Sequence, residues 1–170
     1  MRVLTVGHST RTMDELVAIL RSFAVKVVAD IRTVPRSRHN PQFNGDALAA
    51  ALPAYGIRYV HLAALGGLRH ARKDSLNTGW HNDSFRGFAD YMQTAAFNAG
   101  VDELRGLAHQ GRLVLLCAEA VPWRCHRSLV ADALTALGAH VEHVTGPSTS
   151  RPHRLTPFAR VEGVRVMYPG

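Results

Sequence analysis

The chain has 170 residues, 46% of them hydrophobic and 19% charged, which suits a globular domain with a core of its own. It has no apolar run long enough to span a membrane, and its first residues lack the pattern of a cleaved signal peptide. We therefore expect a cytoplasmic protein with no membrane partner, folded as one domain over residues 1–170, with residues 146–170 as a C-terminal extension.

The first sixty residues read as strands that alternate with helices. Each expected strand is a short apolar run that stops at a polar residue or a glycine, as buried parallel strands do. These strands are residues 2–7, 25–31 and 57–61. Thr12 and Glu15 match a capping box ahead of a helical apolar stripe that ends at Phe23. Asp46 is expected to cap a short helix, residues 47–52, after a loop that contains proline.

The rest of the chain opens with an irregular stretch, residues 62–83, whose length is typical of a functional loop. Helical periodicity then predicts a helix over residues 85–96 with Ser84 as its cap, a second over 101–109, and a third that ends at Gly138. Two further strands are expected at residues 112–116 and 139–144, and a small hairpin at residues 157–168. Together these elements predict a three-layer α/β domain with a mostly parallel sheet of about five strands.

Polar side chains follow the last apolar residue of each of the first four strands. They are His8, Ser9, Asp30, Arg32, His61, Cys117 and Glu119. Because the carboxyl ends of parallel strands meet at one edge of a sheet, and ligands bind there in open α/β sheets, we expect these side chains to converge. The sequence therefore predicts where a site lies more firmly than what it does.

Residues 113–127, LVLLCAEAVPWRCHR, read as a strand, a turn and a helix N-terminus, and they contain both cysteines. Cys117 is either an inert core thiol or a nucleophile whose pKa is lowered by the helix N-terminus and by Arg124, His126 and Arg127. Cys125 lies in the same field, and the sequence does not choose between the two. The candidates for catalysis at this edge are Cys117, Cys125, Asp30, His8 and Glu119.

Two other readings of the cysteines stay open. One is a zinc site formed by Cys117, Cys125, His126 and His8, although the seven residues between the cysteines depart from the usual ligand spacing. The other is a redox pair or sensor. Neither reading calls for an organic cofactor, and none is expected.

The formal net charge of +7 favours an anionic partner, either an anionic small molecule or nucleic acid. Candidate anion-binding residues near the expected edge are Ser9, Arg32, Arg38, Arg124, His126 and Arg127. Asp30 and Arg32 can equally form a local ion pair that orients the following loop. For nucleic acid, the basic residues in view are Arg36, Arg38, Arg69, Arg72, Lys73 and Arg124.

Several motifs resemble a known family along almost the whole chain. These are TVGHS at 5–9, ADIRTVPRSR at 29–38, LGG at 65–67, CAEAVPWRCHR at 117–127 and LTPFARVEGVRVMYP at 155–169. They are similar to the bacterial and archaeal family known as domain of unknown function 488. The resemblance implies a single α/β domain of uncharacterised activity.

A weaker likeness is to rhodanese and cysteine-phosphatase domains, carried by a strand that ends in Asp-x-Arg and a strand that ends in cysteine. The loop after Cys117 departs from their pattern, since it has no glycine and contains Glu119 and Pro122. The function we expect is a small enzyme that acts on a phosphate- or sulfur-containing anion, with a reactive cysteine as the candidate nucleophile. The alternatives are a nucleic-acid or nucleotide-binding module without catalysis and a zinc-binding protein; the oligomeric state is not predicted.

Overall fold

The computed structural model describes all 170 residues, and its main sheet has six strands in the order β3-β2-β4-β1-β5-β6. The strands are β1 (Arg2–Gly7), β2 (Val27–Asp30), β3 (Arg58–His61), β4 (Leu113–Cys117), β5 (His140–Gly146) and β6 (Thr149–Pro152). The first five are parallel to one another, and β6 is an antiparallel strand at one edge. The expected α/β class with a mostly parallel sheet is confirmed.

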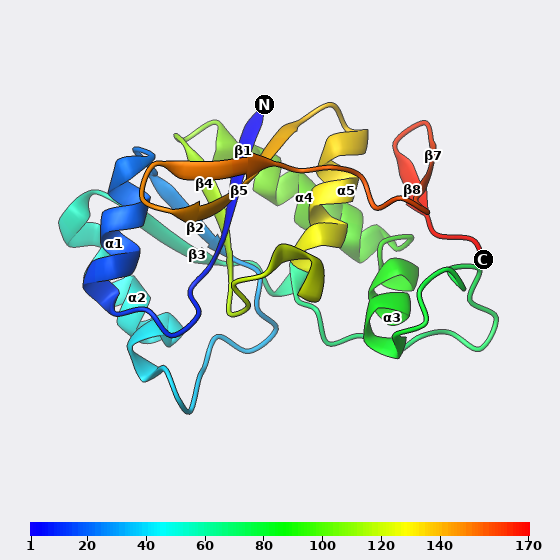
Figure 1. The fold of residues 1–170 in the computed structure, drawn as a ribbon, viewed down its shortest axis with the longest axis horizontal. Coiled ribbons are helices and arrows are strands. Elements are labelled where there is room, and N and C mark those ends of the chain that lie inside the picture. Colours follow the sequence, from blue (N-terminus) through cyan, green and yellow to red (C-terminus); the bar gives the residue numbers. More distant parts are fainter.

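Helices cover both faces of this sheet (Figure 1). The helices are α1 (Met13–Ser22), α2 (Gly45–Ala51), α3 (Asp83–Tyr91), α4 (Ala95–Ala108) and α5 (Arg127–Ala136). One hydrophobic core joins the sheet to α1 and α2, and a larger one joins the opposite face to α3, α4 and α5. None of these helices combines the length and the apolar character that crossing a bilayer requires.

Successive residues of each strand face alternately one hydrophobic core and the other. On β4, Leu113, Leu115 and Cys117 face the core of α3–α5, whereas Val114 and Leu116 face the core of α1 and α2. Successive side chains of a strand point to opposite faces, so residues that end neighbouring strands can lie at one edge and still be separated by the sheet. This separation decides how the candidate site is assembled.

Most element boundaries follow the sequence, and the differences have local causes. Thr12 and Glu15 form the predicted capping box of α1. Asn82, not Ser84, caps α3 by accepting from two backbone N–H groups, and α2 begins at Gly45 rather than after Asp46. The boundary between α3 and α4 lies near Thr94, whose side chain caps α4. The predicted boundary between these helices near residue 100 was therefore wrong.

The C-terminal extension, residues 146–170, contributes β6 and then the predicted small hairpin, β7 (Arg160–Glu162) and β8 (Arg165–Met167). Its last residues then run beside the long loop before α3 (Figure 1). There the Tyr168 N–H donates to Asn77 Oδ1 at 2.9 Å, and the Gly79 N–H donates to the Tyr168 carbonyl at 2.8 Å. The extension therefore holds residues 77–79 in place.

Candidate functional site: a buried thiol pair

Backbone hydrogen bonds join the carboxyl ends of β1, β2 and β4 into one edge. The His8 N–H donates to the Cys117 carbonyl at 2.9 Å, and the Ile31 N–H donates to the Leu116 carbonyl at 3.0 Å. The Ser9 N–H continues the pattern beyond the strands by donating to the Ala118 carbonyl at 2.9 Å. The predicted polar termini thus lie at one edge, but the sheet separates their side chains into two groups.

The first group is the thiol pair, Cys117 and Cys125. The pair faces the core of α3–α5, and its two Sγ atoms lie 3.0 Å apart. Cys117 is 2% exposed and Cys125 is 8% exposed, and both thiols are free. Cys125 does not start the helix, as the sequence suggested, but lies in extended backbone between a 3-10 turn (Pro122–Arg124) and α5. That extended residue turns its sulfur back toward the end of β4.

Arg127 supplies the positive charge at the thiol pair. Its Nη1 donates to Cys117 Sγ at 3.1 Å, and its Nη2 donates to the Ala120 carbonyl at 3.1 Å. The side chain is 0% exposed, it makes no salt bridge with a carboxylate, and its Nε–H has no hydrogen-bond partner. A buried cation without a counterion costs several kcal/mol. The Cys117 sulfur is the one group in contact with the guanidinium that can become an anion.

The surroundings separate the pKa values of the two thiols. The hydrogen bond from Cys125 lowers the pKa of Cys117, and the positive charge of Arg127 lowers it further against the opposing effect of burial. Cys125 donates that hydrogen bond and is also buried, so its pKa is raised. The Arg127 backbone N–H, at the N-terminus of α5, lies 3.4 Å from Cys125 Sγ. The arrangement favours a thiolate at Cys117 and a neutral thiol at Cys125.

His126 packs beside the thiol pair as a neutral ring. Its Nε2 lies 2.9 Å from the Ile31 carbonyl, so Nε2 carries the proton, and its Nδ1 lies 3.6 Å from Cys125 Sγ. Burial lowers the pKa of His126. A Cβ added at Gly67 would collide with this ring, which gives the Gly-Gly pair of the long loop a packing role.

The second group is the Asp30 cluster, which comprises Asp30, Arg32, Tyr59 and His8 on the opposite face of the sheet. Asp30 accepts from Arg32 Nε at 2.9 Å, from Arg32 Nη2 at 2.6 Å and from the Tyr59 hydroxyl at 2.6 Å. Asp30 is fully buried and Arg32 is 7% exposed. The ion pair that the sequence offered as one alternative is therefore present, and Arg32 also orders the following loop by donating to the Phe43 carbonyl at 2.7 Å.

His8 belongs to this cluster and not to the thiol pair. Its Nδ1 lies 2.8 Å from the Ser9 carbonyl and must carry the proton, so Nε2 accepts from Arg32 Nη1 at 3.3 Å. Burial lowers the pKa of His8, and its ring stacks on Phe43 with centroids 4.6 Å apart. The ring is a satisfied and neutral part of the core of α1 and α2.

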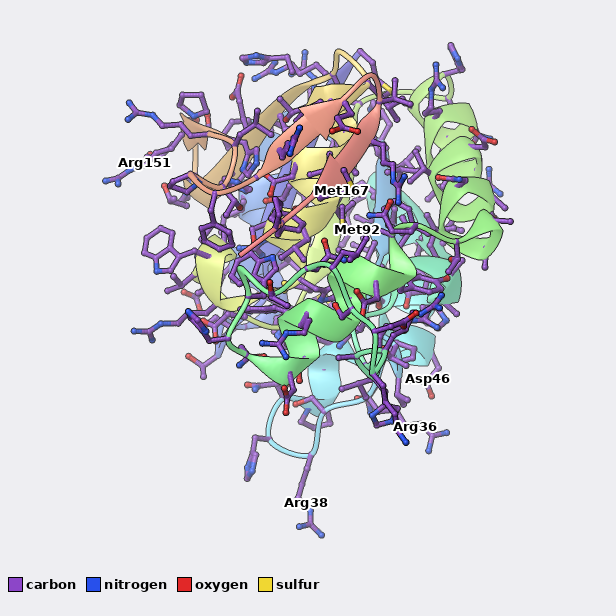
Figure 2. All side chains as sticks on the ribbon, turned by 90° about the vertical axis from the view of Figure 1, so that its right-hand side faces the viewer. Arg36, Arg38, Asp46, Met92, Arg151 and Met167 are labelled. Atoms are coloured by element: carbon purple, nitrogen blue, oxygen red, sulfur yellow. The ribbon has the colours of Figure 1, made fainter.

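The other candidates are exposed or already engaged. Glu119 uses one carboxylate oxygen to accept from the Val121 N–H at 3.1 Å, within its own loop, and its carbonyl lies 3.5 Å from Cys117 Sγ. The side chains of Arg38 and Arg124 are exposed and make no hydrogen bond or salt bridge. Arg38 projects at the tip of its loop and Arg36 points outward nearby (Figure 2). No anion pocket is assembled from the six predicted residues, so the anionic substrate stays a prediction.

The basic residues of the long loop differ in how far they are engaged. Arg69 lies over the Tyr91 ring, 3.6 Å from its centroid, and donates to the Gly66 carbonyl at 3.1 Å. Arg72 pairs with Asp74 on the surface, at 3.0 Å. Lys73 is exposed and unpaired. The contacts of these basic side chains do not test the binding of nucleic acid, which stays a prediction.

Cys117, Cys125 and His126 lie close together, but the fourth donor of the predicted zinc site does not join them. His8 lies on the opposite face from the two sulfurs, and His126 directs its Nε2 to a backbone carbonyl. The structure has no group of three or more His, Cys, Asp or Glu side chains arranged to hold a metal ion. His8 is separated from the two sulfurs because successive side chains of β1 and β4 point to opposite faces of the sheet.

A third polar group, the Asp132 network, was missed from the sequence. Asp132 of α5 is fully buried and accepts from His153 Nε2 at 2.8 Å, from the Thr156 hydroxyl at 2.7 Å and from the Tyr168 hydroxyl at 2.7 Å. His153 Nδ1 lies 2.8 Å from His143 Nε2, and His143 Nδ1 lies 2.6 Å from the Thr5 hydroxyl. The one available signal was a carboxylate inside the apolar run of α5, since the pattern of the tail predicts a hairpin but not its contacts with this helix.

Residues 12–134 match the family model described as "Domain of unknown function DUF488". The match spans more than half of the chain, and the chain belongs to this family. No curated protein and no solved structure showed significant similarity to the chain. The likeness to rhodanese and cysteine-phosphatase domains gains no support from these comparisons.

Proposed function

We propose that this DUF488 domain works through the thiol pair as a redox-active dithiol, with Cys117 as the thiolate and Cys125 as the second thiol. The observation that carries the proposal is the 3.0 Å separation of two free Sγ atoms, with Arg127 Nη1 on the Cys117 sulfur. Two thiols that merely fill a core do not require a buried cation beside one of them. The family assignment names no activity, so the site alone carries the argument.

The charges of the thiol pair suit the two steps of thiol–disulfide chemistry. The Cys117 thiolate attacks an electrophilic atom of a two-electron oxidant, and the leaving group departs with the electron pair of the broken bond. The Cys125 sulfur then attacks Cys117 Sγ, and the bond between Cys117 and the rest of the oxidant breaks. The group that leaves takes the proton of Cys125, and the intramolecular disulfide is complete. The dithiol gives up two electrons in total, and the oxidant accepts them. A thiol at Cys125 with a raised pKa is a poor first nucleophile, which supports this order.

The loop of residues 118–124 separates the thiol pair from solvent. Its residues Ala118, Glu119 and Ala120 are exposed, and so is Trp123, at 69%. Two of its carbonyls contact the site directly, that of Glu119 at Cys117 and that of Ala120 at Arg127. We expect an oxidant to reach the sulfurs by displacing this loop, while the strand and the helix that hold the cysteines stay in place.

The test is whether the two cysteines form an intramolecular disulfide under a mild oxidant, followed by intact mass and thiol counting. Because the chain has no other cysteine, the loss of both thiols in a monomer identifies the bond. We expect rapid and reversible formation in the wild type and none in Cys117→Ser or Cys125→Ser. A wild type that keeps both thiols, while a denatured sample oxidises, contradicts the proposal.

A further inference from the structure

The burial of the thiol pair restricts which oxidant can reach it. Cys117 is 2% exposed, and two hollows of the surface contain no cysteine in their linings. One hollow lies at the opposite edge of the sheet beside Arg105 and His109, and the other lies beside Arg69 and His70. Because the Cys117 sulfur is buried, a peptide or a large disulfide needs a wider opening of the fold to reach it than a small molecule does.

The polar groups around Cys117 suit an oxygen-containing ligand. The Arg127 guanidinium reaches the sulfur through Nη1, and its Nε–H is buried without a partner. Buried donors in proteins nearly always have a partner, so this guanidinium has hydrogen-bonding capacity that the fold does not use. An oxygen atom that approaches the Cys117 sulfur also comes within reach of Arg127 Nη1, which lies 3.1 Å from that sulfur. A hydrocarbon group at the same place could not accept this hydrogen bond.

Resting on the proposed function, we propose that the oxidant of the thiol pair is a small hydroperoxide and that Arg127 binds its oxygens. The Cys117 sulfur attacks the terminal oxygen, the O–O bond breaks, and the departing alkoxide or hydroxide takes a proton from water. The product at Cys117 is a sulfenic acid. Cys125 Sγ attacks that sulfur, and hydroxide leaves with the Cys125 proton as water. One hydroperoxide is thus reduced to an alcohol or water, and one disulfide is formed.

The experiment compares hydrogen peroxide, the bulkier cumene hydroperoxide and glutathione disulfide as oxidants of the reduced protein. We expect the rate of thiol loss to fall in that order, with little reaction of the folded protein with glutathione disulfide. Cys125→Ser should accumulate a sulfenic acid at Cys117 that dimedone traps, whereas the wild type should yield the disulfide and no dimedone adduct. Cys117→Ser should lose the fast reaction with peroxide.

The role of Arg127 is tested with Arg127→Lys, which keeps the charge but loses the planar donor fork. Circular dichroism reports whether the variant folds, and Arg151→Lys, an exposed site on β6, is the matched control (Figure 2). We expect Arg127→Lys to slow the peroxide reaction more than it slows oxidation by diamide, an oxidant without a peroxide bond. Equal slowing with both oxidants overturns the oxygen-binding role.

The outcomes separate this inference from the proposed function. If diamide closes the disulfide but hydrogen peroxide reacts no faster with the folded protein than with free cysteine, the hydroperoxide inference fails and the dithiol proposal stands. If the fast reaction leaves Cys125→Ser without a dimedone adduct, the assignment of Cys117 as the attacking sulfur is wrong. If neither oxidant closes the disulfide, both proposals fall.

Discussion

At the scale of single residues, the charge of Arg127 and the ionisation of Cys117 depend on each other. The guanidinium is fully buried and has no carboxylate partner, and the sulfur is buried and has no other cation in contact. Either charge alone is costly in a protein interior, and each offsets part of the cost of burying the other. A neutral core cysteine in contact with a buried arginine would leave this cost unrelieved.

Gly7 is a second residue whose identity follows from close packing at the carboxyl edge of the sheet. A Cβ at this position would overlap the Glu119 carbonyl, so β1 can approach the loop after Cys117 only with glycine here. We predict that Gly7→Ala destabilises the protein by about 2 kcal/mol, the cost typical of overpacking. Urea denaturation measures it. Gly106→Ala in α4, where a Cβ meets nothing within 4 Å, is the control and should stabilise slightly. Equal effects of the two substitutions would contradict this packing argument.

At the scale of elements, α5 and the C-terminal extension meet at Asp132. Three side chains of the extension, His153, Thr156 and Tyr168, donate to this one carboxylate. Tyr168 in turn is joined through its backbone to Asn77 and Gly79 of the long loop. The extension therefore ties the helix that begins at Arg127 to the loop that packs on His126.

We predict that Asp132→Asn lowers the free energy of unfolding by about 3 kcal/mol, because three buried donors lose a charged acceptor. Hydrogen exchange should quicken in residues 153–170 and 77–79 before it quickens in the strands of the sheet. Asp102→Asn on the exposed side of α4 is the matched control. Unchanged protection of the extension in Asp132→Asn contradicts the proposed anchoring role.

The paired histidines of β5 and the extension predict a pH dependence of stability. Burial, then the charges of His153 and Arg127, lower the pKa of His143 from 6.5 to about 3, while Asp132 opposes this. The ring stays neutral in the fold and takes up a proton in the unfolded chain. Stability due to His143 is therefore complete above pH 6.5 and is lost as the pH falls toward 3, by about 1.4 kcal/mol per pH unit.

Burial lowers the pKa of His8 and His126 as well, so both act in the same direction as His143. Urea denaturation at a series of pH values measures the total slope, and His143→Gln should reduce it. A slope that is unchanged in His143→Gln would mean that this ring does not titrate as the network requires.

At the scale of the whole molecule, the parallel sheet could be predicted because each strand is an apolar run that ends at a polar residue or glycine. The sixth strand, Thr149–Pro152, could not, because it is largely exposed and polar and is defined by its pairing with β5. The sequence predicted that the candidate residues lie at one edge of the sheet, but not that their side chains are divided between its two faces. Asp30 pairs in register with Leu116, one residue before Cys117, and no local pattern in the sequence fixes that register.

Oxidation of the thiol pair should affect the stability of the whole fold. A disulfide removes the thiolate and leaves Arg127 as a buried cation without a counterion, at a cost of about 3–5 kcal/mol. Closing the short loop between the cysteines returns about 2.5 kcal/mol through the unfolded chain. We predict that the oxidised protein is less stable than the reduced protein by about 0.5–2.5 kcal/mol. Thermal denaturation of both forms checks the order, and a more stable oxidised form would contradict it.

The central claim is that the pKa of Cys117 is lowered in the folded protein, so that Cys117 ionises before Cys125. Its most direct test is the ultraviolet absorbance of thiolate as a function of pH, which requires no reagent to reach the buried sulfur. We predict that the wild type and Cys125→Ser titrate one thiol well below the ordinary value of about 8.5, and that Cys117→Ser does not. The midpoint in Cys125→Ala should lie above that of the wild type, since the hydrogen bond from Cys125 is lost. A folded wild type with no thiolate absorbance until the pH exceeds that ordinary value would contradict the account.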